Sequence, residues 1–293
     1  MKTLTFKTEW SSKLVLGLGL AMLTFFSSCE KDDADTTLVA DATIDEATIE
    51  SEAVAQADYE ELDEIAVNIM GLAEGTSGGR IDGATDERCH CAEITHDMEN
   101  KTITIDFGDG CEGPNGVVRA GIIFITYTGP RFVPGSEWTL TFRDFFVNRR
   151  QIEGLRTVTN ISESLESNPT FHIKLEGGKV TWPDGTYATR EVNKVRVWIR
   201  ADNPLLDEFH ILEGSETSGT NRRNIAYKTM VLTDLVYKKI CRTDRKVRFP
   251  VQGTKEVTKR EVTCVIDYGD GTCDGKVELV CDNDRVTDLS FVE

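Results

Sequence analysis

The stretch "VNKVRVWIR" (residues 192–200) alternates between two kinds of side chain, and this pattern decides the fold class. In an extended chain, successive side chains point to opposite faces. The mostly charged face holds Val192, Lys194, Arg196, Trp198 and Arg200, and the apolar face holds Val195, Val197 and Ile199. Such alternation is typical of an antiparallel strand with one face on a core and the other in water. We therefore predict a half-solvated antiparallel strand whose charged row faces solvent.

The same character extends over the chain beyond residue 100. Segments rich in Val, Ile, Thr, Phe and Tyr are separated by short polar or Gly-containing joints. They include "KTITIDF" (101–107), "GIIFITYTG" (121–129), "EWTLTFRDFFV" (137–147) and "KVELVC" (276–281). No strand–helix–strand rhythm interrupts them. The sequence therefore predicts a mainly β fold with a short N-terminal helix and disulfides. We expect an antiparallel meander of about ten to thirteen strands, arranged as a curved sheet, a sandwich or an open barrel.

A phrase near each end of this region occurs twice, as "IDFGDGCEG" (105–113) and "IDYGDGTCDG" (266–275). Asp-Gly is a strong turn dipeptide, because Gly accepts positive φ and Asp hydrogen-bonds the backbone of the turn. The repeat predicts two related hairpin units within one β domain of residues 89–293. In the second copy, pairing residues whose numbers sum to 545 sets Ile266 opposite Leu279 and Cys264 opposite Cys281.

Seven cysteines follow Cys29, and in an exported chain they are expected to form disulfides. The hairpin register pairs Cys264 with Cys281. If the two copies of the phrase are equivalent, the cysteine after each turn bonds the cysteine that opens its unit. This predicts Cys91 with Cys111 and Cys241 with Cys273. Cys89 is left over.

The N-terminal part of the mature chain has a different pattern. Residues 51–74 place Val54, Leu62, Ile65, Ile69 and Leu72 near helical spacing, which predicts an amphipathic helix. Residues 75–88 ("GTSGGRIDGATDER") are rich in Gly, Ser, Thr and Asp, which predicts a linker.

The first 28 residues have the parts of a secretory signal peptide. Lys2, Lys7 and Lys13 precede the apolar run "LVLGLGLAMLTFF" (14–26), which is too short to cross a bilayer comfortably. "SSC" then places Cys29 where a bacterial lipoprotein carries its acyl chains. Residues 29–50 are expected to form an acidic tether. Residues 30–64 hold fourteen acidic residues against one lysine, out of a chain net charge of −17. This composition argues against a nucleic-acid partner.

Two resemblances bear on localisation. Lys31, Asp32 and Asp33, directly behind Cys29, resemble the surface-export signal of Bacteroidota lipoproteins. The order of phrases from "ITIDFGDGCEG" through "KVTWPDGTYATR" (179–190) to "IDYGDGTCDGKVEL" (266–279) resembles a group of uncharacterised lipoproteins of the same bacteria. The resemblance implies a protein anchored to the outer membrane through its lipid and exposed at the cell surface, but implies no activity. "DFGDG" and "DYGDG" also resemble the hallmark of PKD domains, which are immunoglobulin-like adhesion modules.

The sequence has candidate residues for three kinds of site, namely a calcium site, a zinc site and a catalytic site. Asp106, Asp109, Asp267 and Asp270 are candidate calcium ligands, but the full calcium-loop pattern is missing and turn chemistry explains them. "CHC" (89–91) offers adjacent Cys and His without the second pair that a zinc site needs. The four histidines fall in no catalytic motif. We therefore expect no metal, no cofactor and no catalytic residues.

Binding is the remaining class of function. Trp182 and Trp198 are candidate platform residues for a sugar. A row of basic strand residues would suit an acidic polymer, although such a row is more often simply solvated: Arg190, Lys194, Arg196, Arg200, Arg222, Arg223 and Lys228. The sequence predicts a non-catalytic structural or binding module of the cell envelope, with a surface polysaccharide or a protein as partner. The alternatives are a glycan-binding accessory lipoprotein, a PKD-like adhesion module, or an enzyme whose site one sequence does not reveal.

Overall fold

The computed structural model describes residues 46–75, 79–81, 86–244, 247, 249–281 and 286–290. The predicted signal peptide, Cys29 and the export residues Lys31, Asp32 and Asp33 lie outside the described residues. The helical elements are α2 (Glu46–Glu74), η2 (Pro114–Gly116), η3 (Pro204–Leu206) and α3 (Lys239–Asp244). The strands are β1 (Gly79–Ile81), β2 (Glu93–Asp97), β3 (Thr102–Asp106), β4 (Cys111–Glu112), β5 (Val118–Tyr127), β6 (Glu137–Val147), β7 (Arg150–Asn160), β8 (Thr170–Thr181), β9 (Tyr187–Ile199), β10 (Glu208–Ile211), β11 (Glu216–Thr220), β12 (Ala226–Lys238), β13 (Gln252–Lys259), β14 (Val262–Asp270), β15 (Lys276–Cys281) and β16 (Val286–Ser290).

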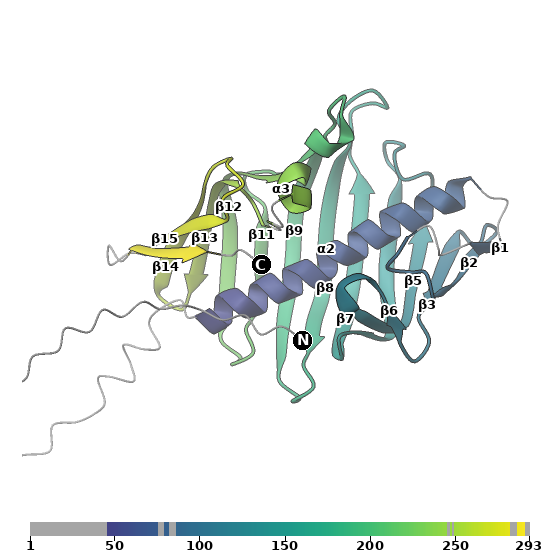
Figure 1. Cartoon of the computed structure of the whole chain (residues 1–293), viewed down its shortest axis with the longest axis horizontal. Helices are drawn as coiled ribbons and strands as arrows, with labels where there is room; N and C mark the ends of the chain where they lie inside the picture. Colours follow the sequence, from purple (N-terminus) through teal and green to yellow (C-terminus); the bar gives the residue numbers. More distant parts are fainter. Residues whose placement is uncertain are drawn as a thin grey trace, which may run out of the picture.

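All of these strands belong to one antiparallel sheet (Figure 1). Their order in space follows their order in the chain from β1 to β16, with β4 beside β5 and with β10 and β11 both placed between β9 and β12. The predicted mainly β meander is confirmed, in its curved-sheet form. The sheet has sixteen strands, more than predicted, because short strands such as β4 and β10 carry too few residues to show alternation. Both copies of the repeated phrase lie in this one sheet, which differs from the immunoglobulin-like sandwich that the PKD resemblance implies.

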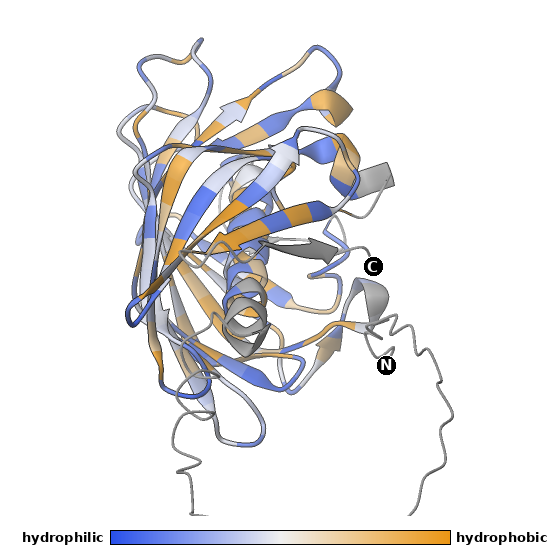
Figure 2. Ribbon diagram, turned by 90° about the vertical axis from the view of Figure 1, so that its left-hand side faces the viewer, coloured by the Kyte–Doolittle hydropathy of each residue, from blue (hydrophilic) through white to orange (hydrophobic). Residues whose placement is uncertain are grey.

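The sheet curves around helix α2, as Figure 2 shows in a view turned by a quarter from Figure 1. Strand registers shift at irregular positions between β5 and β6, β6 and β7, β7 and β8, β12 and β13, and β13 and β14. Such bulges bend a strand and increase its twist. At the first of them, Gly121 has φ +80°, and a Cβ there would meet the Asp144 carbonyl oxygen at 1.9 Å. Only glycine, which has no Cβ, fits at this close approach of β5 to β6. We call the face of the sheet that α2 covers the concave face.

Helix α2 begins at Glu46, so the predicted helix start at residue 51 was too late, and the predicted tether 29–50 is helical over its last residues. The buried side of the helix runs through Ala55, Tyr59, Leu62, Ala66, Ile69 and Ala73. Val54 and Leu72, which we placed on the apolar face, are only partly buried at its margins. Alanines occupy several of these buried positions because their small side chains let the helix backbone approach the sheet. A prediction based on hydrophobic residues gives alanine little weight, so it does not mark these positions.

The prediction for the charged row of β9 was wrong. Arg190 and Lys194 lie on the concave face, where they pair with Glu52 and Glu60 of α2. The side chain of Arg190 is 6% exposed and that of Lys194 is 11% exposed. The physical reason is that α2 brings carboxylates to this face, so charge can be buried there in pairs. Period-two alternation shows which residues share a face, but not which face is covered.

The two copies of the repeated phrase are alike locally and different in topology. In each, the first Asp accepts a hydrogen bond from the backbone N–H two residues on: Asp106 from Gly108, and Asp267 from Gly269, both at 2.8 Å. The second copy connects β14 to β15 as the predicted hairpin, in the predicted register. In the first copy, β3 and β4 both pair with β5, and the reversal comes later, at η2. The prediction of two equivalent hairpin units was therefore wrong for the first copy.

The structure joins the six cysteines in the three predicted pairs, Cys91–Cys111, Cys241–Cys273 and Cys264–Cys281. Cys89 is free and buried. The predicted linker 75–88 contains strand β1, which pairs with β2, so the β domain begins ten residues earlier than the predicted boundary of 89. Two main apolar clusters result. The larger lies between α2 and the strands from β2 to β9, and the smaller lies among β10 and β12 to β15.

Candidate functional site

The two apolar clusters are separated by a group of polar side chains that we call the polar pocket. Helix α2 contributes Glu52, Gln56 and Glu60, and strand β9 contributes Arg190 and Lys194. The other polar side chains are Thr229 and Tyr237 of β12, Lys255 of β13, Thr217 of β11, and Ser215, which lies directly before β11. Ile211, Val231 and Leu235 of the smaller apolar cluster also line it. The pocket is therefore the place where helix carboxylates meet sheet cations.

An interrupted strand creates this pocket. β10 and β11 occupy one position in the sheet, since β10 pairs with the last residues of β9 and β11 pairs with the first. Between them, Leu212–Ser215 interrupts the regular pairing but stays bonded to both neighbours. The Leu212 N–H donates to the Val195 carbonyl of β9, and the Gly214 N–H donates to the Val231 carbonyl of β12. The Ser215 hydroxyl accepts from the Val195 N–H. On the other side, β12 shifts register against β13 twice after Val231.

The contacts in the pocket form two groups along one side of α2. Arg190 Nη1 donates to Glu52 Oε1 at 3.2 Å, and Lys255 Nζ lies 3.6 Å from Glu52 Oε2. One turn further, Gln56 Nε2 donates to the Tyr237 hydroxyl at 2.9 Å and to Glu60 Oε1 at 3.0 Å. Lys194 Nζ donates to that same Glu60 oxygen at 3.2 Å. The helix thus satisfies the sheet cations with a single stripe of residues at positions i, i+4 and i+8.

The protonation states of these groups follow from burial and from their partners. Burial raises the pKa of Glu52, but Lys255 and Arg190 together bring it below its ordinary value, so Glu52 is ionised. Burial lowers the pKa of Lys255, yet Glu52 raises it above the ordinary value. Lys194 is different. Burial, helped by Arg156 and Arg196, lowers the pKa of Lys194 to about 8, and Glu60 offsets only part of this. Lys194 is the cation that its surroundings stabilise least.

The charges of the pocket do not balance. Among the described residues, Arg190, Lys194 and Lys255 pair with two carboxylates, those of Glu52 and Glu60. Asp63 also acts on Lys194, but its carboxylate is already paired with Arg156. Glu216 also lines the pocket, but its carboxylate pairs with the exposed Lys228 at 2.9 Å. With α2 in place, the pocket holds a cavity of about 30 Å³, which is room for roughly two water molecules. The arrangement can therefore hold anionic groups, and in this conformation the helix supplies them.

Further along α2 the ion pairs become more deeply buried. Asp63 accepts from Arg156 Nε at 2.5 Å and from Arg156 Nη2 at 2.7 Å, and each of these side chains is 1% exposed. Arg196 Nη1 lies 3.6 Å from the same carboxylate. Asp58 pairs with Arg150 at 2.7 Å. The acidic side chains of α2 are thus structural partners of the concave face, and those of Asp58 and Asp63 are buried.

The predicted calcium candidates serve the backbone of their turns. Asp106 and Asp267 accept from Gly108 and Gly269, and Asp270 accepts from the Thr272 N–H at 3.1 Å. Asp109 is exposed. In the part of the chain that the structure describes, none of these four carboxylates belongs to a group of three acidic, His or Cys ligand atoms.

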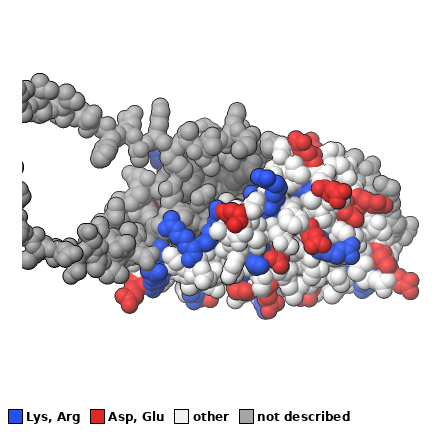
Figure 3. Space-filling model, turned by 90° about the horizontal axis from the view of Figure 1, so that it is seen from below, with Lys and Arg blue, Asp and Glu red and all other residues white. Residues whose placement is uncertain are grey.

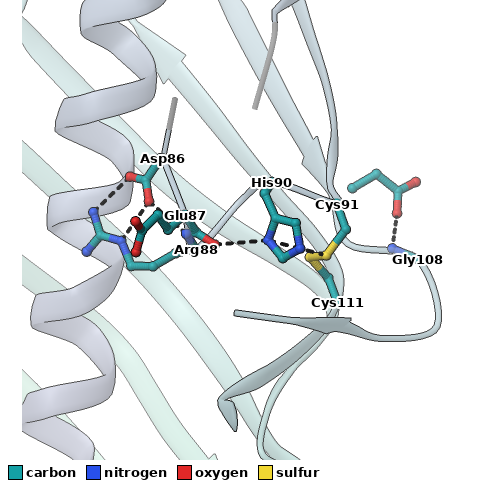
Figure 4. The surroundings of a disulfide bond; sticks show 8 residues. Asp86, Glu87, Arg88, His90, Cys91, Gly108 and Cys111 are labelled. Carbon is teal, nitrogen blue, oxygen red and sulfur yellow. Dashed lines mark hydrogen bonds and ion pairs between the residues drawn. A yellow bond between two sulfur atoms is a disulfide. The ribbon is translucent and has the colours of Figure 1, made fainter. Parts of the chain in front are cut away.

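One such ligand group exists among the described residues, and it contains His90, Cys91 and Cys111 (Figure 4). The two sulfurs are bonded to each other, and His90 Nδ1 lies 3.9 Å from Cys91 Sγ and 3.0 Å from the Glu87 carbonyl oxygen. A disulfide offers no thiolate to a metal. The third member of "CHC", Cys89, is buried, and burial raises the pKa of its thiol to about 12.

The two tryptophans proposed for a sugar platform lie at opposite ends of the β8–β9 hairpin. Trp182 follows β8 in the turn, where Arg222 stacks over its ring at 4.6 Å. Trp198 lies near the end of β9, stacks on Phe209 at 5.8 Å and donates Nε1 to Asp207 at 3.0 Å. About eleven strand residues separate them, which is on the order of 35 Å. They do not form one platform.

The predicted basic row divides between two environments. Arg190, Lys194 and Arg196 lie under α2, whereas Arg222 and Lys228 pair with Asp184 and Glu216 near the surface. Arg200 is exposed in the loop after β9. On the face seen in Figure 3, basic and acidic side chains are interspersed. The basic residues that contribute to the polar pocket are therefore those that lie beneath α2.

Sequence reasoning missed the helix side of the pocket. The helical pattern of residues 51–74 assigns no function to Glu52, Gln56 or Glu60, and no motif marks Lys255. The spacing of these residues gives no signal for the pairing, because α2 crosses the strands obliquely and its rise does not predict which strand residues it meets (Figure 1).

No family model, no curated protein and no solved structure matches this chain. Neither helix among the described residues combines the length and the apolar character needed to cross a membrane.

Proposed function

We propose that this chain is a lipid-anchored, surface-exposed envelope protein that acts as a non-catalytic binding module for a carboxylate-rich partner. The binding surface is the concave face around the polar pocket. The observation that carries the proposal is the set of buried cations Arg190, Lys194 and Lys255, which outnumber the two carboxylates that pair with them among the described residues of the helix. Cations held at fixed positions on a rigid sheet recognise anionic groups.

Anchoring and exposure rest on the sequence. The apolar run before Cys29, the lysine and two aspartates behind it, and the resemblance to Bacteroidota lipoproteins support them. Mass spectrometry of the purified native protein tests the anchor. We expect an acylated Cys29 at the new N-terminus, and an unmodified N-terminus at another residue would overturn the anchor. Labelling of intact cells with an antibody against the β domain tests surface exposure.

Binding is tested by thermal denaturation with poly-glutamate, polygalacturonate and uncharged dextran. We expect the melting temperature to rise with the two carboxylated polymers and to stay unchanged with dextran. Lys194→Met/Lys255→Met removes two cations of the pocket, and Lys174→Met/Lys276→Met is the matched control at exposed positions. The first variant should lose the shift and the control should keep it. An absent shift in the wild type, or an equal loss in both variants, would refute the proposed surface.

A further inference from the structure

We infer that the concave face around the polar pocket is a docking groove for an acidic amphipathic helix of a partner protein, and that the N-terminal half of α2 occupies this groove as an exchangeable internal ligand. The inference rests on the proposed function and names its partner class and its regulation. Four features of the helix–sheet contact support it.

The two halves of α2 are held by different forces. In the C-terminal half, Leu62, Ile65, Ala66, Ile69 and Met70 are at most 2% exposed. In the N-terminal half, Ala55 and Tyr59 are the buried apolar residues among those described. The other described contacts of that half are ion pairs and hydrogen bonds made by Glu52, Gln56, Asp58 and Glu60. The C-terminal half is therefore a fixed anchor, and the N-terminal half is held by polar contacts.

Ion pairs and hydrogen bonds of this kind allow a competing ligand to replace the N-terminal half of α2. A buried ion pair returns only part of the cost of taking its two charges out of water, so its net contribution is small. A second carboxylate in the same position recovers the same Coulomb energy. A ligand that presents matching carboxylates therefore gains the same ion-pair energy as Glu52 and Glu60, and must offset the higher effective concentration of the tethered helix with its additional negative charge. An apolar contact such as that of Ile65 with the sheet offers no comparable substitute.

The size of the pocket indicates why a partner must displace the helix. The cavity of about 30 Å³ left beside α2 admits water but no side chain of a partner. The groove beneath is already shaped for a helix, because it holds one. Binding of an amphipathic helix in a groove of this kind uses anchors on one helical face.

The contacts also specify the partner. Arg190 and Lys194 meet carboxylates at helix positions i and i+8, and Arg156 and Arg196 meet one at i+11. Small or flat residues, here Ala55 and Tyr59, lie between them against the sheet. The uncompensated third cation of the pocket favours a ligand with more negative charge than α2 provides. Asp63, at i+11, belongs to the fixed C-terminal half and keeps Arg156 and Arg196 occupied. We therefore expect a partner helix with acidic residues at i and i+8 and one further carboxylate in its first turns.

The test uses a fluorescent peptide of residues 46–74 as the probe, added to the full chain and followed by anisotropy. Glu52→Gln/Glu60→Gln weakens the internal ligand, which raises the fraction of chains with an open groove. We expect this variant to bind the peptide at least about tenfold more tightly than the wild type does. A peptide carrying Glu52→Gln and Glu60→Gln should not bind. The control variant Glu153→Gln alters an exposed carboxylate that pairs with Lys179, and it should behave as wild type.

Three results would overturn the inference. The first is no peptide binding to a folded Glu52→Gln/Glu60→Gln variant, and the second is equal binding of the neutralised peptide. The third is dimerisation of the variant on size exclusion in place of peptide binding, which would assign the groove to α2 of a second copy. If the variant does not fold, hydrogen exchange of the wild type decides. Amides of residues 50–60 should exchange at least about tenfold faster than those of 62–73, and uniform protection would refute exchange. If carboxylated polymers bind but the peptide does not, only this inference fails and the proposed function stands.

Discussion

At the scale of single residues, Tyr59 shows how one side chain fixes the helix to the sheet. Its hydroxyl donates to the Glu153 carbonyl oxygen at 2.5 Å and accepts from the Lys179 N–H at 3.1 Å. These two residues are paired on β7 and β8, next to the register shift between Glu153 and Leu155. Tyr59 therefore ties α2 to the point where two strands bend.

Tyr59→Phe should lower the free energy of unfolding by about 1–2 kcal/mol, because it leaves buried backbone groups without a partner. Urea denaturation measures this directly. Tyr187→Phe is the control, since Tyr187 is 43% exposed, and it should change stability by less than about 0.5 kcal/mol. Equal effects of the two substitutions would contradict the role given to Tyr59.

Lys194 makes stability depend on pH above neutrality. Its pKa is about 8 in the folded chain and near its ordinary value of 10.5 in the unfolded chain. Between these values the unfolded chain binds more protons, so folding stability rises with pH. Relative to Lys194→Met, the wild type should be constant from pH 6 to about 7.5. It should then gain up to about 1.4 kcal/mol per pH unit toward pH 10.

The measurement is chemical denaturation of both proteins across that range, with Lys276→Met as the matched control at an exposed lysine. The wild-type and Lys276→Met curves should run parallel. Parallel curves for the wild type and Lys194→Met would show that Lys194 does not titrate in this window.

At the scale of elements, the contact between α2 and the sheet depends on charges that are buried in pairs. Asp63 and Arg156 are the clearest case, since both are 1% exposed. Removal of one partner from such a pair leaves an uncompensated buried charge, whereas replacement of both by apolar residues is often neutral. The pair fixes the position of the helix on the sheet more than it stabilises the fold.

Asp63→Leu should therefore destabilise the protein by about 3–5 kcal/mol, and Asp63→Leu/Arg156→Met should recover most of that loss. Arg196, the second neighbour of Asp63, is 16% exposed and keeps access to water in the double variant. Thermal and urea denaturation of the three proteins test this. Glu74→Gln, at the partly exposed pair with Arg131, is the control and should cost no more than about 1 kcal/mol. A double variant as unstable as Asp63→Leu would contradict the pairing argument.

The elements also show what the sequence could and could not predict. Register follows from alternation and turn position, so the pairing of Cys264 with Cys281 was predictable. The sequence could not predict which face of β9 is covered, because the covering element is a helix more than a hundred residues earlier in the chain. The strand break at Leu212–Ser215 that opens the pocket has no signal of its own, since a short polar segment reads as an ordinary loop.

At the scale of the whole molecule, two apolar clusters of unequal size share one sheet. The cluster beneath α2 draws on the helix and on strands from β2 to β9, whereas the cluster of β10 and β12 to β15 has far fewer buried residues. Two of the three disulfides lie in or beside the smaller one. Cross-links contribute most where a core is small.

Cys264→Ala/Cys281→Ala should cost about 3 kcal/mol in the chain-entropy model for a loop of this size. The loss should be local. Amides of β13–β15 should exchange faster with solvent, while those of β6–β8 keep their protection. Hydrogen exchange read by mass spectrometry separates the two regions, and a uniform increase over the whole sheet would show that the clusters unfold as one unit. The double variant Cys91→Ala/Cys111→Ala is the matched control on the other side of the sheet.

The nearly sequential strand order has a consequence for how the chain assembles during its synthesis. Each strand from β5 to β9 finds its neighbour in the segment made just before it, so these contacts form without long loops and favour rapid folding. Helix α2 is made before any strand that will cover it. Its carboxylates keep the newly made helix soluble through that interval, since Arg190 of β9 and Lys255 of β13, the partners of Glu52, are made well over a hundred residues after it.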